Sequence, residues 1–177
     1  LLATRPSLGA VRSLLADLDG TPPTDVVSGS EAPAVLDDAA AVIRTTHRSI
    51  RIRLAGDYTA AAGLTDHLRT AATSLMASRP DDLSEYLPFL RMQWGLTYQM
   101  AGHFAESNAE FRSAHQLGAE RKQDYIVRNA AANSALNWAM AGDAHRVHEW
   151  LSLAQATGTA DDWAAAFVGI GGFLAHA

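Results

Sequence analysis

The residues best suited to chemistry are two histidines and a glutamate in the last third of the chain. His145 and His148 lie three positions apart and are followed by Glu149. On a helix, that spacing places both imidazole rings on one face. A zinc site needs three or four ligands, and the sequence offers no matching third group. We therefore predict a solvent-exposed polar face here and no metal site.

Motifs for a nucleophile or for phosphate binding are also missing. No serine lies in a Gly-x-Ser-x-Gly elbow, and the chain has no cysteine. The glycines between positions 169 and 172 follow no strand pattern and precede no Gly-Lys-Ser/Thr, so we expect them to permit close helix packing. The acidic pairs at 81–82 and 161–162 are expected just before helices, where carboxylates favour the helix dipole. The sequence predicts a non-catalytic protein without a cofactor.

The composition and charge are those of an ordinary folded protein. Of its 177 residues, 48% are hydrophobic and 19% are charged, and the net charge is −5. Alanine dominates the apolar share, which favours closely packed helices. No apolar run reaches the ~20 residues that cross a bilayer. The lack of cysteine agrees with a cytoplasmic location, which we predict.

The arginines do not suggest a DNA-binding surface, which gains its affinity from clustered cations that neutralise phosphates. The densest basic group is interpreted as spread around a helix instead of lying on one face. It consists of Arg44, Arg48, Arg51 and Arg53.

Three similar turns provide the main signal for the fold. Each contains Ala-Gly, and they begin at Ala55, Ala101 and Ala141, 46 and then 40 residues apart. Glycine tolerates the left-handed conformation that ends many helices, and Asp57 and Asp143 can cap the helices that follow. Recurrence at this period is typical of a solenoid built from helix pairs.

The middle unit matches the tetratricopeptide repeat (TPR) pattern most closely. Its small residues, Gly95 and Ser107, are expected to let the two helices approach, while the aromatic residues fill the space around them. The residues in register with the pattern are Gly95, Tyr98, Gly102, Phe104, Ser107, Phe111 and Ala114.

The fold class predicted from these patterns is all-α, a right-handed α-solenoid of TPR-like antiparallel helix pairs. Residues 1–30 are predicted as a short helix at 7–19 and a Pro/Gly/Ser linker, with Ser30 capping the next helix. Residues 31–177 are predicted as the repeat domain. The expected pairs are 31–55 with 57–78, 83–101 with 103–118, and 122–141 with 143–157, followed by a truncated fourth pair from about 160 to 177.

In a TPR, the first helix of each pair lines a concave groove. Amide side chains in a semi-apolar groove can bind an extended peptide or a small polar ligand. The alternative is that the apolar members pack against neighbouring helices and the asparagines are merely solvated. The predicted groove residues are Phe89, Met92, Gln93, Leu96, Gln99, Asn129, Asn133 and Asn137.

Two stretches, Leu87–Thr97 and Arg128–Leu136, resemble the TPR-like region of large bacterial LuxR-type transcriptional regulators related to MalT. The resemblance covers roughly residues 40–177. It implies a sensor or protein-interaction segment that accompanies an ATPase domain and a C-terminal helix-turn-helix. Neither a Walker loop nor a helix-turn-helix is present here, so the resemblance assigns ATP and DNA binding to other parts of the protein. We also expect both ends of the chain to be cuts in a longer polypeptide.

Two alternatives stay open. In one, the chain belongs to regulators with an N-terminal helix-turn-helix followed by TPRs, and residues 1–30 are the intervening linker. In the other, it is a plain scaffold or oligomerisation module, for example a homodimer. The partner expected from the sequence is an unidentified small molecule, protein or peptide.

Overall fold

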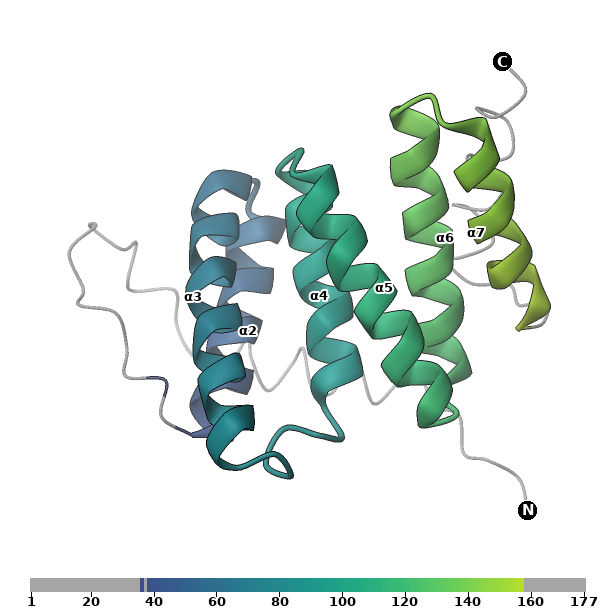
Figure 1. Cartoon of the computed structure of the whole chain (residues 1–177). Coiled ribbons are helices and arrows are strands. Elements are labelled where there is room, and N and C mark those ends of the chain that lie inside the picture. Colours follow the sequence, from purple (N-terminus) through teal and green to yellow (C-terminus); the bar gives the residue numbers. More distant parts are fainter. Residues whose placement is uncertain (1–35, 37, 158–177) are drawn as a thin grey trace, which may run out of the picture. The chain divides into compact units, whose positions relative to one another are not determined.

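The computed structural model describes residue 36 and residues 38–157, and this part contains six helices and no strand (Figure 1). The all-α class is therefore confirmed for the described residues. The helices predicted at 7–19 and from about 160, the linker and Ser30 lie outside them. The helices are α2 (Ala39–Leu54), α3 (Tyr58–Ser78), α4 (Leu87–Met100), α5 (Phe104–Glu120), α6 (Asp124–Met140) and α7 (Ala144–Ala156).

The helices pack in chain order. Each one contacts the next, and α2 also contacts α4, which in turn contacts α6 (Figure 1). Among the described helices, α3 and α5 have no such backbone contact. The even-numbered helices therefore form a row, with α2 against α4 and α4 against α6, while α3 and α5 have no backbone contact with each other.

The Ala-Gly turns adopt the predicted conformation. Gly56, Gly102 and Gly142 have φ values of 91°, 79° and 74°. In that left-handed region a side chain is strained, which explains glycine at these positions. Asp57 and Asp143 cap the following helices, each accepting a backbone N–H three residues later at 3.0 Å. Both caps were predicted from the sequence.

The start of α2 differs from the prediction. The helix begins at Ala39, not at position 31, and its N-cap is Asp38. The Asp38 carboxylate accepts the backbone N–H of Ala41 at 2.6 Å, which satisfies one of the free donors of the first turn. Leu36 is not helical, so a continuous helix from position 31 is wrong.

The start of α4 also differs, because residues 80–86 form turns instead of helix. The helix begins at Leu87, and Pro88 lies in its first turn, where its missing N–H costs no helical hydrogen bond. Asp82 is therefore too far from the helix to act on its dipole. It pairs instead with Arg79 at 3.4 Å on the surface, which corrects the role predicted for the 81–82 pair.

Close approach of α4 and α5 depends on small residues, as predicted. A Cβ added at Gly95 would lie 2.6 Å from two ring carbons of Phe111, which is fully buried. Ser107 Oγ donates to the Gly95 carbonyl at 2.9 Å. The α2–α3 pair has the same contact with the donor on the other helix, since Ser49 Oγ donates to the Ala61 carbonyl at 3.1 Å.

Alanine substitutions at two glycines should change stability in opposite directions. We expect Gly95→Ala to lower the free energy of unfolding by about 2 kcal/mol, because the added methyl group would clash with the buried Phe111 ring. Gly63 lies inside α3 with nothing within 4 Å of an added Cβ, so Gly63→Ala should raise it by about 1 kcal/mol. Urea unfolding of the two variants measures both changes. A Gly95→Ala protein as stable as wild type would contradict the packing.

Candidate partner-binding face

The helices α2, α4 and α6 carry side chains at equivalent positions, counted from the glycine of the turn that follows each helix. Within each helix these positions are spaced 4, 3 and 4 residues apart, which places them on one stripe. Because α4 contacts both α2 and α6, the three stripes lie side by side, and they are here called the α2–α4–α6 face. It consists of Ile43, His47, Ile50 and Leu54; Phe89, Gln93, Leu96 and Met100; and Asn129, Asn133, Leu136 and Met140.

The end of this face nearest the turns is apolar and open to solvent. Leu54, Met100 and Met140, each the last residue of its helix, are 70%, 51% and 58% exposed. The apolar residues one turn earlier, Ile50, Leu96 and Leu136, are half-buried beside them. Single exposed apolar residues are ordinary, but a row of them on adjacent helices is typical of interaction surfaces.

Half of the large apolar side chains that are exposed in the described residues belong to this face. Four of the eight are members of it, and Tyr86 and Tyr125 extend the stripes of α4 and α6 by about one turn. Only two, Tyr58 and Leu153, lie elsewhere. The eight are Leu54, Tyr58, Tyr86, Phe89, Met100, Tyr125, Met140 and Leu153.

Arg53 joins α2 to α4 beneath the face. Its Nη1 donates to the Gln93 carbonyl at 3.0 Å and to Thr97 Oγ1 at 3.2 Å, and its Nη2 donates to Gln93 Oε1 at 2.9 Å. Burial lowers the pKa of Arg53 to about 10, so it stays charged at neutral pH. These bonds hold α2 in register with α4.

Gln99 repeats this connection between α4 and α6. It occupies the position of α4 that Arg53 occupies in α2, and its Nε2 donates to the Asn133 carbonyl at 3.2 Å and to Asn137 Oδ1 at 2.7 Å. In both cases the side chain donates to a backbone carbonyl of the neighbouring helix and to the side chain that lies four residues after that carbonyl. Equivalent bonds at equivalent positions give the three helices a common spacing.

The predicted groove residues are placed in two groups. Phe89 is 37% exposed, and three others are half-buried: Gln93, Leu96 and Gln99. The remaining four are buried: Met92, Asn129, Asn133 and Asn137.

The buried members of the predicted groove make contacts within the protein. Met92 packs in a cluster with Phe111. Asn129 and Asn133 donate to carbonyls one turn earlier in α6, and Asn137 Nδ2 donates to α5. The alternative in which the asparagines are solvated is therefore wrong. The open part of the face consists mainly of apolar residues that sequence reasoning did not select, although Leu54 and Met140 have the same offset from their turns as Met100.

A second polar cluster lies where α3, α4 and α5 meet. The Glu110 side chain is 1% exposed, and its carboxylate binds Arg69 Nε at 2.6 Å and Arg91 Nη1 at 2.9 Å. The Tyr98 hydroxyl donates to Asp66 Oδ1 at 2.6 Å. Since α3 and α5 have no backbone contact, Glu110 connects them through side chains. Sequence reasoning missed this carboxylate, because nothing in its local pattern indicates burial.

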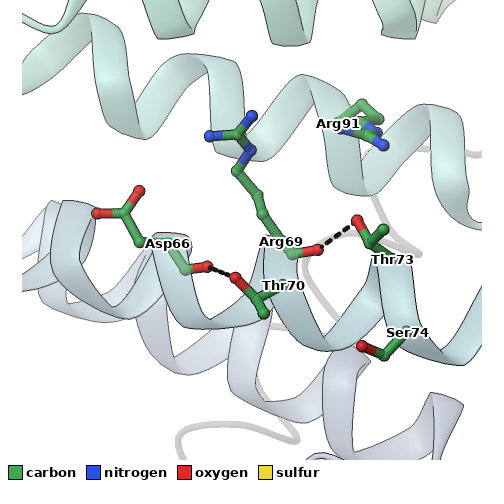
Figure 2. Close-up of a pocket in the computed structure, with 6 residues that line it drawn as sticks. All are labelled: Asp66, Arg69, Thr70, Thr73, Ser74 and Arg91. Atoms are coloured by element: carbon green, nitrogen blue, oxygen red, sulfur yellow. Dashed lines mark hydrogen bonds between the residues drawn. The ribbon is translucent and has the colours of Figure 1, made fainter.

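An open depression of about 450 Å³ lies beside this cluster, along α3 (Figure 2). Its two arginines face two carboxylates, those of Asp66 and the buried Glu110, so the charges of the cluster balance. The hydroxyls of Thr70 and Thr73 donate to carbonyls of their own helix. The cluster is therefore better explained as a connection between helices than as an anion site. The lining residues are Asp66, Arg69, Thr70, Thr73, Ser74 and Arg91.

The buried Tyr98 should make stability depend on alkaline pH. Burial and the hydrogen bond to Asp66 raise the pKa of Tyr98 above its usual value of ~10. The unfolded chain then releases the phenol proton first, so the free energy of unfolding should fall as the pH rises above about 10. Denaturation of wild type and Tyr98→Phe at about pH 8 and about pH 10.5 tests this. The lowered pKa of Arg53 makes stability rise with pH in this range, but Arg53 is present in both proteins and its effect cancels in the comparison. Equal pH dependence of the two proteins would contradict the raised pKa of Tyr98.

The histidines and the glutamate considered first in the sequence do not form a metal site in the described residues. His145, His148 and Glu149 are exposed on α7, as predicted for a polar face. No group of three or more histidine, aspartate or glutamate side chains in residues 36 and 38–157 is arranged to hold a metal ion. No helix within these residues has the length and apolar character needed to cross a membrane.

The arginines of α2 correct one prediction. Arg44, Arg48 and Arg51 are exposed, and their spacing of 4 and 3 residues places them on one stripe. Arg53 is 7% exposed and lies on the opposite, packed side. The four arginines are therefore not all on one face, as predicted, but three of them share a face instead of being spread around the helix.

The chain matches no protein-family model, no curated protein and no solved structure.

Proposed function

We propose that these helices form a TPR-like right-handed α-solenoid whose α2–α4–α6 face binds a segment of another protein, without catalysis. The row of exposed apolar residues at Leu54, Met100 and Met140 is the observation that carries the proposal. A partner that covers these apolar side chains removes them from water, which makes binding favourable. Methionine, which is flexible and polarisable, adapts well to such partners.

The repeated contacts support the solenoid part of the proposal. The Arg53 and Gln99 connections relate α2 to α4 and α4 to α6 by equivalent bonds. The Ser49 and Ser107 contacts recur within successive pairs. In a solenoid each unit repeats the contacts of the one before it, and the first helices of the units lie side by side.

A protein segment suits this face better than a small ligand. The apolar row extends over three helices, whereas small ligands are held in concave pockets that surround most of their surface. A helix presents apolar residues at three- and four-residue intervals to such a surface, and an extended peptide presents them at alternate positions. Both forms can cover the row.

The wider role follows from the resemblance of Leu87–Thr97 and Arg128–Leu136 to LuxR-type regulators. On that basis the chain is the sensor or protein-contact segment of a cytoplasmic bacterial transcription regulator, and DNA is bound by another part of the protein. A regulator with an N-terminal helix-turn-helix is the alternative arrangement. The location of the helix-turn-helix in the full-length protein distinguishes the two.

Peptide selection tests the binding proposal. Random peptides of about twenty residues, long enough for a helix of ~30 Å, are displayed and selected on the immobilised chain, and fluorescence anisotropy measures the affinity of the enriched ones. The double variant Leu54→Ser/Met140→Ser should bind them at least about tenfold more weakly, a loss of ~1.4 kcal/mol. Tyr58→Ser/Leu153→Ser is the matched control, because it removes the two exposed apolar residues that lie off the face.

Two results would count against the proposal. One is equal binding by the face variant and the control, with circular dichroism showing both folded. The other is self-association of the chain by light scattering that Leu54→Ser/Met140→Ser abolishes, which would favour the scaffold alternative.

A further inference from the structure

Positive charge is concentrated on one helix of an acidic protein. The chain has a net charge of −5, yet α2 has four arginines and neither aspartate nor glutamate among its 16 residues. Arg44, Arg48 and Arg51 are exposed on one stripe. Arg48 already has an interaction partner, so the argument depends on Arg44 and Arg51.

The arginine stripe borders the candidate partner-binding face. Arg44 and Arg51 each follow a face residue directly, Ile43 and Ile50, and successive residues of a helix are ~100° apart. On the exposed side of α2, a stripe of mainly apolar residues therefore lies next to a stripe of arginines. A partner that crosses the apolar row toward α2 would reach Arg51, which lies three residues before Leu54, and Arg44 lies about two helical turns further along α2.

We propose that the partner segment is an acidic, amphipathic peptide of another protein. Its apolar residues would cover Leu54, Met100 and Met140, and its aspartates or glutamates would pair with Arg44 and Arg51. Arginine binds carboxylates through two parallel N–H donors, which orients the partner as well as attracting it. This inference rests on the proposed function and adds the chemistry of the partner.

A nucleic acid fits these observations less well. Its affinity comes from many phosphates neutralised together, whereas the described stripe holds three arginines on a protein of net negative charge. The apolar row beside the stripe would also stay in contact with water under a phosphate backbone. An acidic peptide uses both features at once, since complementary charge raises the association rate and apolar burial supplies affinity.

The composition of the selected peptides tests this inference. Peptides enriched on the wild-type chain should contain more aspartate and glutamate than the starting library, together with leucine, isoleucine or phenylalanine. Arg44→Glu/Arg51→Glu should bind them about tenfold more weakly at about 50 mM salt, and the difference should shrink at about 500 mM because salt screens exposed charges. Arg112→Glu/Lys122→Glu is the matched control: both residues are exposed and the change in net charge is the same.

The possible outcomes separate this inference from the function on which it rests. Peptides without an acidic excess, or equal binding by Arg44→Glu/Arg51→Glu and its control, overturn the acidic partner. The proposed function then survives if Leu54→Ser/Met140→Ser still loses binding. Failure to enrich any peptide overturns both. Binding of a single-stranded oligonucleotide that Arg44→Glu/Arg51→Glu abolishes, with no acidic peptide enriched, overturns the inference in favour of nucleic acid.

Discussion

Glu110→Gln is expected to lower the free energy of unfolding by about 3 kcal/mol, because it leaves Arg69 and Arg91 without their shared counter-charge. The two arginine side chains are 36% and 22% exposed and can turn partly toward water, which keeps the loss at the lower end of the range for buried pairs. The carboxylate itself has no such freedom, since its side chain is 1% exposed. Chemical denaturation at neutral pH measures the change.

The matched control for this substitution is Glu106→Gln on the same helix. Glu106 is exposed in the first turn of α5, so the same change of atoms should cost less than about 0.5 kcal/mol. A double-mutant cycle with Arg91→Gln should show a coupling above about 1 kcal/mol, because the two residues share one contact. Equal losses for Glu110→Gln and Glu106→Gln would show that the cluster does not hold α3, α4 and α5 together.

Asn137→Ala is expected to cost about 3 kcal/mol, although the chemical change is small. The fully buried Asn137 amide donates to Ser107 Oγ at 2.9 Å and to Asn108 Oδ1 at 3.0 Å, and accepts from Gln99 Nε2 at 2.7 Å. Its removal leaves the buried Ser107 and Asn108 and the half-buried Gln99 each short of one partner and opens a small cavity. Thermal or urea unfolding gives the difference in the free energy of unfolding.

Asn133→Ala is the comparison on the same helix. Asn133 is also buried, but its Nδ2 bonds only to the Asn129 carbonyl of its own helix, and its Oδ1 has no partner among the described residues. Its removal leaves no donor of another residue without an acceptor, so the free energy of unfolding should fall by about 1 kcal/mol or less. If Asn133→Ala is the more damaging of the two, the assignment of these amides to their contacts is wrong.

The parts of the fold that the sequence predicted are those that local physics determines. The left-handed turns at Gly56, Gly102 and Gly142 need glycine, so a repeated Ala-Gly shows where three helices end. Asp57 and Asp143 follow as caps for the same local reason. The contact between Gly95 and Phe111 could be predicted because the TPR pattern pairs a small residue with an aromatic one at a known offset.

One turn could not be found in this way. Lys122 has a φ of 57° between α5 and α6, where the next residue's N–H bonds to the Gly118 carbonyl at 2.8 Å. The turn at Gly102 has the same bond, from His103 to the Tyr98 carbonyl at 2.8 Å. The conformation is shared, but lysine does not indicate it. The helix starts at 39 and 87 were not predicted. The few residues before each of them form a cap or turns, and so short a segment has no pattern that distinguishes it from helix.

The candidate site was harder to predict because burial depends on several helices at once. Asn137 and Glu110 have the spacing of surface residues, and only packing against neighbouring helices shows that they are buried. Leu54 and Met140 have the same offset from their turns as Met100, so the exposed row was visible in the sequence. The offset alone does not show that these side chains stay exposed, because their exposure depends on how the neighbouring helices pack.

The most direct test of the partner-binding face is methyl NMR on the chain labelled at its four methionines. Met100 and Met140 lie on the exposed row, Met92 is buried beneath it and Met76 lies on α3. A soluble paramagnetic agent should broaden the methyl signals of Met100 and Met140 and spare Met92. Addition of a selected peptide should then shift the two exposed signals and protect them from the agent, with Met76 unchanged. A peptide that binds while shifting Met76 and leaving Met100 and Met140 exposed to the agent would contradict the account.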